Sequence, residues 1–387
     1  MTNEPNGPSR RSEIEPFLAM DVLSAAVARE QTGARVVHME VGQPSAPAPR
    51  AVLDAAHQAL QDGRLGYTEA LGIRPLRERI AQYYADTHQL DVAADRIAVT
   101  TGSSAGFNLA FLAAFDVGDR VALPTPGYPA YRNILKTLGL EVVEIETNAD
   151  SRWALTPQMI EDAHRQAPLK GVLVASPANP TGTMMSPAAL QALMGTCKGL
   201  GIQFISDEIY HGLVYSGEAA CALRYDDNAI VINSFSKYYC MTGWRIGWMI
   251  VPPALLRPVE RIAQSLYISA PDLSQRAAVA AFDGTAELEA VKAGYVENRA
   301  LLLDRLPRLG FDELLPVDGA FYVYASVRNF SNDSLDFTKR MLAEAGVAAT
   351  PGADFDHDRG HRYMRFSFAG SNADMAEAVG RLGDWLK

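Results

Sequence analysis

The sequence is poor in cysteine, has no excess of positive charge and contains no long hydrophobic run. Its 387 residues include three cysteines, too few for a disulfide framework, and none has a second thiol at metal-ligand spacing. Asp and Glu number 45 against 35 Lys and Arg, a formal charge of −10, and an acidic chain is a poor candidate for nucleic-acid binding. The apolar stretches are broken well short of the roughly 18 residues that a membrane helix requires. These absences predict a cytoplasmic protein that binds no metal, nucleic acid or membrane.

The apolar and charged shares, 48% and 21%, are those of an ordinary globular protein. The length allows two domains. The opening MTNEPNGPSRRSEIEPF lacks the apolar segment of a signal peptide, and residues 1–14 are expected to form a flexible arm. Short β-branched runs then alternate with longer helical patterns. Helices are expected at 75–85, 105–115, 157–166 and 187–198, and strands at 96–101, 120–123, 141–146, 171–175, 202–206, 229–233 and 246–251.

Several of the expected strands are nearly continuous apolar runs, such as VLVA, IQFIS and IVIN. Such strands suit a sheet that is covered on both faces and is mostly parallel. The alternation of strands and helices therefore predicts an α/β domain whose ligand lies at the carboxyl ends of the strands. From about Glu287 the pattern changes. A long charged helix through 295–306 precedes AFYVYASV and YMRFSFA, which are expected to be half-exposed strands of a separate small α+β domain.

The first candidate site follows the strand expected at 96–101. The segment GSSAG leads directly into a helix, whose start offers free N–H groups and a positive dipole end to a phosphate. The same five residues match G-x-S-x-G, the nucleophile elbow of serine hydrolases, and they also fit an ordinary tight turn. A hydrolase would use Ser104 as nucleophile, Asp207 as acid and His357 or His361 as base.

Polar side chains also follow the later strands. Asn179 lies between two prolines in ASPANPTG, although an ordinary Asn-Pro turn has the same pattern. Asp207 ends a buried strand, where a carboxylate is costly unless a cation or a donor pairs with it. Lys237 and Arg245 follow the strand expected at 229–233. An enclosed lysine can act as a nucleophile or a base, and arginine suits bidentate phosphate binding, but either can also be a surface charge or part of an ion pair.

Together these residues fit one cofactor, pyridoxal 5′-phosphate. It needs a lysine for its Schiff base, a carboxylate for its pyridinium nitrogen, and backbone or cationic donors for its phosphate. The motifs ASPANPTG, SDEIY and SFSKYYCMTGWRIGW resemble those of class I (class I/II) pyridoxal-phosphate-dependent aminotransferases of fold type I. The resemblance extends from about residue 16 to the C-terminus. It implies a large domain with a mostly parallel sheet at 48–286, a small domain formed by 15–47 and 287–387, and a homodimer with shared active sites.

The resemblance implies roles for the matching positions around the cofactor ring. Lys237 would carry the aldimine, and Asp207 would pair with the pyridinium nitrogen. Tyr210 and Asn179 would hold the phenolic oxygen of the ring. Tyr128, where the family often has tryptophan, would stack on the ring.

Other matching positions would bind the phosphate and the substrate. Arg365 in YMRFSFA would bind the α-carboxylate of the substrate, with Gly42 and Asn179 against the same molecule. Tyr67 would reach the phosphate in the neighbouring subunit. The phosphate would otherwise be held by Ser103, Ser104, Ala105, Ser234 and Arg245.

The resemblance implies an aminotransferase that moves an amino group from an L-amino acid to a 2-oxo acid with ping-pong kinetics. Carbon–sulfur lyases and related eliminating enzymes share these motifs and remain an alternative with the same cofactor. No second cation can be assigned to bind a dicarboxylate. Because Phe17, Tyr67 and Tyr267 are expected to border the pocket, a neutral or apolar substrate side chain is expected.

Overall fold

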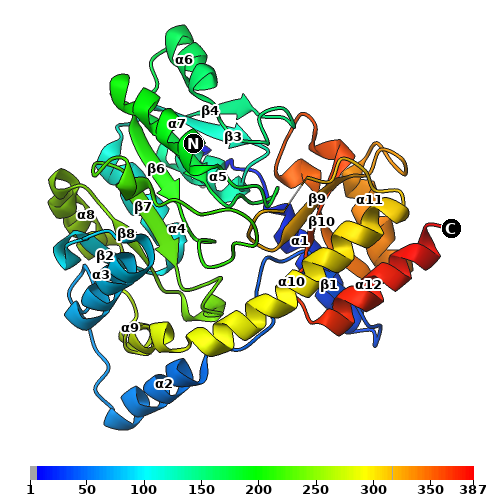
Figure 1. The fold of residues 1–387 in the computed structure, drawn as a ribbon, viewed down its shortest axis with the longest axis horizontal. Helices are drawn as coiled ribbons and strands as arrows, with labels where there is room; N and C mark the ends of the chain where they lie inside the picture. The colour runs from blue at the N-terminus through cyan, green and yellow to red at the C-terminus, as the bar shows by residue number, and fades with distance from the viewer. Residues whose placement is uncertain (1–6, 316) are drawn as a thin grey trace, which may run out of the picture.

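Two sheets organise the computed structural model, which describes residues 7–315 and 317–387 (Figure 1). The larger sheet has seven strands in the order β2-β8-β7-β6-β5-β3-β4. The strands from β7 to β4 pair in parallel, whereas β8 runs antiparallel to both of its neighbours. The strands are β2 (Ile97–Thr100), β3 (Arg120–Thr125), β4 (Glu141–Glu146), β5 (Gly171–Ala175), β6 (Gln203–Asp207), β7 (Ile230–Ser234) and β8 (Gly247–Ile250).

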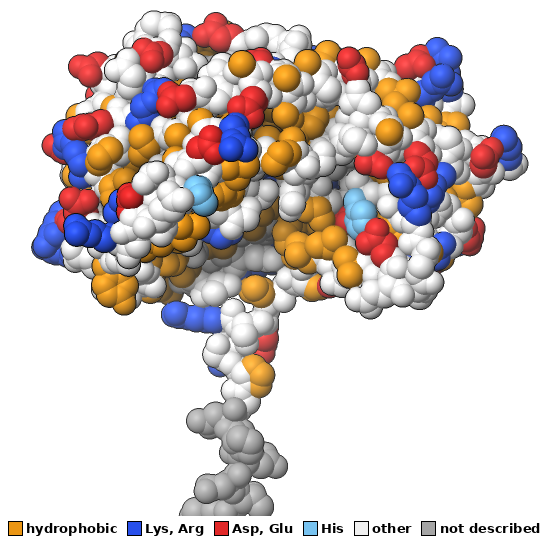
Figure 2. Space-filling model, turned by 90° about the horizontal axis from the view of Figure 1, so that it is seen from below, with side chains coloured by type: hydrophobic (Ala, Val, Ile, Leu, Met, Phe, Trp, Pro, Cys, Tyr) orange, Lys and Arg blue, Asp and Glu red, His pale blue; other side chains and the backbone are white. Residues whose placement is uncertain are grey.

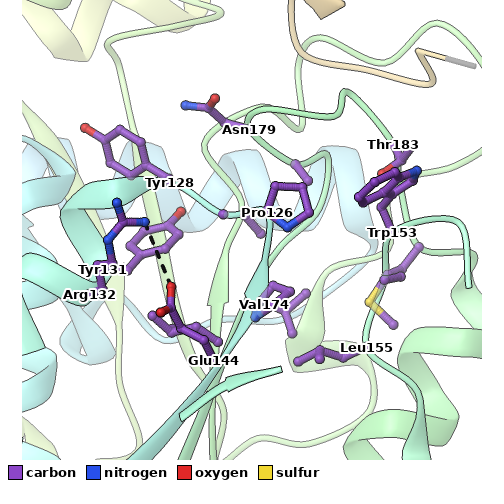
Figure 3. Close-up of a pocket in the computed structure, with 17 residues that line it drawn as sticks. Pro126, Tyr128, Tyr131, Arg132, Glu144, Trp153, Leu155, Val174, Asn179 and Thr183 are labelled. Carbon is purple, nitrogen blue, oxygen red and sulfur yellow. Dashed lines mark ion pairs between the residues drawn. The ribbon is translucent and has the colours of Figure 1, made fainter. Parts of the chain in front are cut away.

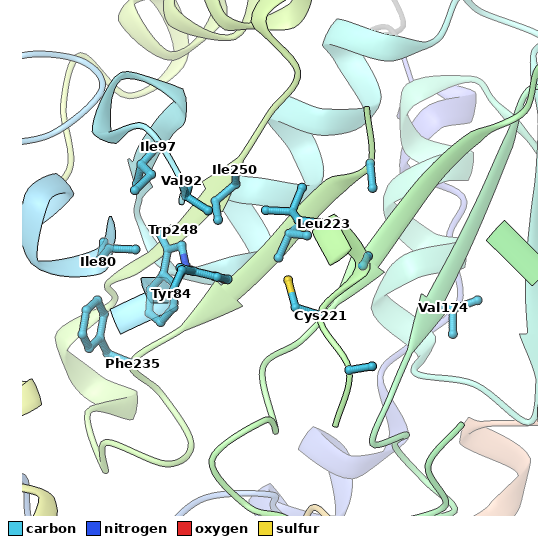
Figure 4. Packing of buried hydrophobic residues seen from close by; sticks show 14 of the residues in the cluster. Ile80, Tyr84, Val92, Ile97, Val174, Cys221, Leu223, Phe235, Trp248 and Ile250 are labelled. Carbon is cyan, nitrogen blue, oxygen red and sulfur yellow. The ribbon is translucent and has the colours of Figure 1, made fainter. Parts of the chain in front are cut away.

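Helices cover both faces of the larger sheet, as its apolar strands predict. Successive side chains of a strand point to opposite faces. Leu173 of β5 therefore packs in one apolar cluster, which includes α4 and α5, while its neighbours Val172 and Val174 pack in another. Figure 4 shows part of the second cluster, around Trp248 and Tyr84. The helices of this part of the chain are α2 (Arg50–Asp62), α3 (Arg74–His88), α4 (Gly102–Ala114), α5 (Pro129–Leu138), α6 (Pro157–Gln166), α7 (Pro187–Gly199), α8 (Pro253–Leu266) and α9 (Asp272–Val279).

Helices α6 and α7 begin where the sequence predicts. The hydroxyl oxygen of Thr156 accepts a hydrogen bond from Met159 N, and that of Ser186 accepts one from Ala189 N. A proline follows each of these capping residues. Both features favour a helix start, because the hydroxyl satisfies a free N–H group and proline needs no hydrogen-bond partner there.

The smaller sheet has four strands in the order β1-β10-β11-β9. Its strands β9 and β11 match the predicted AFYVYASV and YMRFSFA segments, but every residue of both strands is buried. The prediction of half-exposed strands was therefore wrong. Figure 1 shows α10 running from the region of α9 to the smaller sheet. The elements are β1 (Val37–Met39), β9 (Tyr322–Ser326), β10 (Val347–Pro351) and β11 (Tyr363–Ser367), with α1 (Leu18–Glu30), α10 (Thr285–Arg308), α11 (Ser334–Arg340) and α12 (Asn372–Trp385).

The predicted arm at 1–14 falls partly outside the described residues, which begin at 7. Residues 7–14 are exposed and include a single 3-10 turn at Arg10–Ser12. Within the described ranges, no helix combines the length and the apolar character needed to cross a bilayer.

Candidate active site

A cavity of about 170 Å³ lies at the carboxyl ends of the central strands of the larger sheet, against the smaller sheet. Figure 2 shows one face of the molecule, where acidic and basic side chains are mixed and the surface is hollowed near its middle. The cavity brings together ten of the thirteen catalytic, cofactor-binding and substrate-binding residues predicted from the sequence. These are Gly42, Ser103, Ser104, Tyr128, Asn179, Asp207, Tyr210, Lys237, Arg245 and Arg365.

One end of the cavity is built by the start of α4. The capping residue Thr101 makes no side-chain hydrogen bond to the helix, so the first N–H groups of α4 are not capped by its side chain. Gly102 has a φ of 73°, and a Cβ atom there would lie 2.3 Å from Arg245 Nη2. The guanidinium therefore lies against the helix start, beside the hydroxyl groups of Ser103 and Ser104. This end of the cavity suits a phosphate, because the helix dipole and the guanidinium both favour an anion.

Lys237 enters the cavity from the segment that follows β7. Its Nζ donates a hydrogen bond to Gly42 O at 2.6 Å. Burial, together with the nearby positive charges of Arg365 and Arg245, lowers the pKa of the lysine to about 8, and Asp207 partly opposes this effect. A substantial fraction of the amine is therefore unprotonated at neutral to mildly basic pH, as a nucleophile or base requires.

The pKa of Lys237 gives a testable pH dependence. In the cofactor-free protein, we expect competitive labelling of Lys237 with acetic anhydride, followed by peptide mass spectrometry, to show a midpoint near pH 8. Below that pH the amine is protonated and unreactive. An unperturbed lysine has a pKa of about 10.4, so a midpoint there would show that the cavity does not desolvate the amine.

Asp207 lies at the end of β6 and is 4% exposed. Its carboxylate accepts hydrogen bonds from Ile209 N at 3.1 Å and from the hydroxyl of Tyr131. Burial raises the pKa of Asp207 to about 6, and these two donors and Lys237 limit the rise. A cation in the cavity would stabilise the ionised carboxylate further, which a protonated ring nitrogen would do.

Arg365 of β11 is 2% exposed, and its guanidinium carbon lies 4.4 Å from the centre of the Tyr322 ring and 4.8 Å from that of the Phe355 ring. Its Nη1 donates to Asn179 Oδ1 at 2.9 Å, and its Nη2 donates to the carbonyl oxygen of Glu40. Among the described residues, no carboxylate lies within 4 Å of this guanidinium. A buried cation without an ion-pair partner is unfavourable unless an anion binds to it, so Arg365 marks the place of an anionic ligand.

A smaller cavity of about 30 Å³ shares Tyr128, Tyr131 and Asn179 with the larger one (Figure 3). There Arg132 Nη1 lies 3.9 Å from Glu144 Oε1. Trp153 lies on the other side of Pro126 in this view. A space of this size holds about one or two water molecules, so the substrate and cofactor belong in the larger cavity.

Three predicted site residues do not line the cavity. Ala105 packs in the first turn of α4, and Ser234 is buried, with its hydroxyl donating to Ile246 O at 3.1 Å and lying 2.9 Å from Ser236 Oγ. Ser236 lines the cavity in its place. Tyr67 is 83% exposed and lies in a separate hollow with Asp272.

The structure brings only part of the hydrolase alternative together. Ser104 and Asp207 line the same cavity, but neither His357 nor His361 does. His357 Nε2 instead lies 3.0 Å from a carboxylate oxygen of Glu15. Ser104 therefore has no histidine base in this cavity.

Two tyrosines of the site, Tyr131 and Tyr322, were not predicted from the sequence, whereas Tyr267 was predicted to border the pocket. Tyr131 and Tyr322 line the cavity, as does the predicted Phe17, whose ring lies 5.7 Å from that of Tyr128. Tyr267 is not part of the lining, and its hydroxyl instead accepts a hydrogen bond from Asn108 Nδ2 at 3.1 Å. Tyr131 stands three residues after Tyr128 in PGYPAY, and this one-turn spacing on α5 was the available signal.

The residues of the cavity fit pyridoxal 5′-phosphate. The uncapped start of α4 and Arg245 offer a phosphate site, Lys237 offers an amine with a lowered pKa, and Asp207 offers a buried carboxylate. Arg365 adds a buried guanidinium that suits the carboxylate of a substrate. These are the groups that this cofactor and an amino acid require.

Comparisons with known proteins agree with this chemistry. The family model for aminotransferase class I and II matches residues 34–382. The chain is 52% identical over 380 residues to the valine–pyruvate aminotransferase of Mycobacterium tuberculosis, covering 97% of each chain. An aminotransferase structure from M. tuberculosis matches with a TM-score of 0.96 at 51% identity and 99% coverage of both chains. The aspartate aminotransferase of Thermus thermophilus with maleate matches with a TM-score of 0.91 at 31% identity, covering 98% of this chain and 100% of that one.

Proposed function

The chain belongs to the class I and II aminotransferases, and from that premise we propose that it transfers the amino group of valine, or of a similar aliphatic amino acid, to pyruvate. That it is a pyridoxal-phosphate-dependent transaminase follows from the family itself. The observation that carries the site assignment is the buried Arg365, which has an anion-binding guanidinium and no carboxylate partner among the described residues. The relative named for valine and pyruvate supports the choice of substrates.

We propose that the predicted residues of the cavity hold the cofactor as the family resemblance implies. Asp207 would pair with the ring nitrogen, Tyr210 with the phenolic oxygen, and Arg245 and the start of α4 with the phosphate. When bound, the cofactor supplies an aldehyde for the amino group and a ring that spreads the negative charge left at Cα.

The remaining chemistry belongs to the side chains of the protein. Arg365 and Asn179 orient the carboxylate of the amino acid, so that its Cα hydrogen faces Lys237. With the substrate bound, the uncharged Nζ of Lys237 removes the Cα proton as a general base. The same nitrogen later gives up a proton as the product forms. Apolar residues of the cavity lining, among them Phe17 and Met20 at the start of α1, exclude water from the reacting groups. Two half-reactions with different substrates predict ping-pong kinetics.

The lining of the cavity suits a substrate with an aliphatic side chain. The described lining contains Phe17, Met20 and Tyr128, and its arginines are Arg245 and Arg365, which the phosphate and the α-carboxylate would occupy. No further lysine or arginine in this lining can bind a side-chain carboxylate. A charged side chain would therefore lose its hydration without a compensating partner.

The substrate proposal predicts a strong preference. With pyruvate as acceptor, we expect kcat/KM for valine to exceed that for aspartate by about 100-fold or more, because an unpaired buried charge costs several kcal/mol. The test measures steady-state turnover of each amino acid with pyruvate, and the change in visible absorption during the first half-reaction, without pyruvate, checks the same order of preference. Alanine, leucine and phenylalanine serve as neutral comparisons. A preference for aspartate over all of them would contradict an aliphatic substrate.

We further propose that the active form is a homodimer and that it works in the cytoplasm. We also propose that residues 15–47 and 287–387 form the small domain and residues 48–286 the large one. Exposed apolar side chains support a second copy. Leu65 and Tyr67 come just before Thr68, whose N donates a hydrogen bond to Ser269 Oγ at 3.3 Å, and the exposed Ile268 is the chain neighbour of Ser269. Side chains of this kind on one surface indicate a protein interface. The two sheets support the domain division, and three buried free thiols suit a reducing compartment.

The dimer proposal predicts a light-scattering mass of twice the 42.0 kDa chain. It also predicts complementation between two defective chains. A mixture of Lys237→Ala and Tyr67→Ala chains, unfolded and refolded together, should exceed the summed activity of the separate variants. One site of each hybrid dimer would then combine an intact Lys237 with an intact Tyr67 from the other chain. A monomer mass, or no gain on mixing, would contradict shared sites.

A further inference from the structure

Tyr322 connects three parts of the candidate site, although no motif of the sequence marked it. It lies at the start of β9, is 1% exposed and lines the cavity. Its hydroxyl lies 2.8 Å from the hydroxyl of Tyr210 in a buried hydrogen bond. Because Tyr210 is buried as well, each hydroxyl provides the other with a partner that water cannot supply.

The ring and the hydroxyl of Tyr322 make further contacts. The centre of the ring lies 4.4 Å from the guanidinium carbon of Arg365, within the range of a cation–π interaction. The hydroxyl is seated against Gly42, where an added Cβ atom would lie 1.8 Å from it. Gly42 O in turn accepts the hydrogen bond of Lys237 Nζ. Tyr322 thus contacts Tyr210, Arg365 and Gly42. These are the residue proposed to hold the phenolic oxygen, the one proposed to bind the carboxylate, and the one that accepts the hydrogen bond of Lys237.

We propose that Tyr322 is a positioning residue with two separable functions: its hydroxyl holds and polarises Tyr210, and its ring holds the guanidinium of Arg365 in place. The inference rests on the roles proposed above for Tyr210 and Arg365. Hydrogen bonds in a buried chain strengthen one another, so Tyr210 donates more strongly when its oxygen accepts from Tyr322. The ring of Tyr322, together with that of Phe355, packs against the guanidinium and fixes its plane for bidentate carboxylate binding.

The function of the hydroxyl is tested by Tyr322→Phe in the holoenzyme. The readout is the pH midpoint of the visible absorption change of the bound cofactor, measured without substrate. Loss of the hydroxyl weakens the donor to an oxygen that carries negative charge, so deprotonation of the chromophore becomes less favourable and the midpoint rises by about 0.5–1 pH unit. A midpoint equal to that of the wild type would overturn the proposed function of the hydroxyl.

Tyr324→Phe is the matched control. Tyr324 lies two residues further along β9, is equally buried, and its hydroxyl has no hydrogen-bond partner among the described residues. Its ring stacks on Tyr363 at 4.9 Å. Removal of this hydroxyl should leave the absorption midpoint unchanged. A shift equal to that of Tyr322→Phe would show a general effect of the strand and would overturn the proposal.

The function of the ring is tested by binding of 3-methylbutanoate, an unreactive carboxylate, measured by calorimetry. Tyr322→Phe keeps the ring and should bind it within about twofold of the wild type, whereas Tyr322→Leu should bind about tenfold more weakly. Equal binding by all three proteins would overturn the function of the ring. Should Tyr322→Leu fail to fold, Tyr322→Phe still decides the function of the hydroxyl. A wild-type enzyme that shows no spectral change with valine would instead contradict the proposed function itself.

Discussion

Replacement of Lys237 by alanine is expected to reduce transamination by on the order of 10⁴-fold or more, because it removes the side chain proposed as both nucleophile and base. The side chain reaches the centre of the cavity, where its Nζ donates to Gly42 O and its pKa is lowered to about 8. No other lysine lines the described cavity. The variant should still bind the cofactor non-covalently, because Arg245, Asp207 and the start of α4 are unchanged. Steady-state turnover with valine and pyruvate, and cofactor retention after gel filtration, measure the two effects.

Lys170→Ala is the control for this experiment. Lys170 is exposed at the start of β5, at the opposite end of the strand from the site, and its replacement should leave turnover unchanged. Borohydride reduction of the wild-type holoenzyme should attach the cofactor to the peptide that contains Lys237. Near-wild-type turnover by Lys237→Ala would show that the lysine assignment is wrong.

Much of the site could be predicted because its residues lie directly after buried strands. Asp207, Lys237 and Asn179 each follow an apolar run that is recognisable in the sequence, and parallel strands bring such positions to one edge of a sheet. Local patterns also fixed α6 and α7, where a hydroxyl and a proline mark the start. The predicted strands at 141–146 and 171–175 coincide with β4 and β5. The boundaries of the other five differ by one or two residues, because the ends of a strand depend on hydrogen bonds to its neighbours rather than on its own sequence.

The rest could not be predicted because it depends on contacts between distant segments. Tyr131 reaches Asp207 from α5 across 76 positions of the chain, and no local pattern marks a phenol that donates to a buried carboxylate. The sequence of β9, YVYAS, alternates aromatic and aliphatic residues and ends in a serine, so it does not show that the sheet has a cavity on one side and helices on the other. Tyr67 lies outside the cavity of its own chain, and the predicted role of Tyr67 needs a second copy.

The electrostatic function of Asp207 predicts the second large effect. Asp207→Asn should reduce kcat by about 10²–10³-fold, because breaking a buried ion pair costs about 3–5 kcal/mol and the neutral amide cannot hold a proton on the ring nitrogen. Asparagine keeps the size of the side chain, so the fold should be retained. Burial raises the pKa of Asp207 to about 6 in the chain alone, and the carboxylate is therefore ionised above that pH.

The pH dependence of the variant separates loss of charge from loss of shape. In the wild type, cofactor affinity should fall as the pH drops through about 6, because protonation of Asp207 removes the negative charge that attracts the ring nitrogen. In Asp207→Asn the affinity should already be low and should lack this transition. Tyr131→Phe is the matched comparison, because it keeps the carboxylate of Asp207 and removes one hydrogen-bond donor to it. The pKa of Asp207 should therefore rise, and the transition should move to higher pH. If Asp207→Asn binds the cofactor and turns over like the wild type across this range, Asp207 does not hold the ring nitrogen, and its buried carboxylate serves only the hydrogen bonds to Ile209 N and Tyr131.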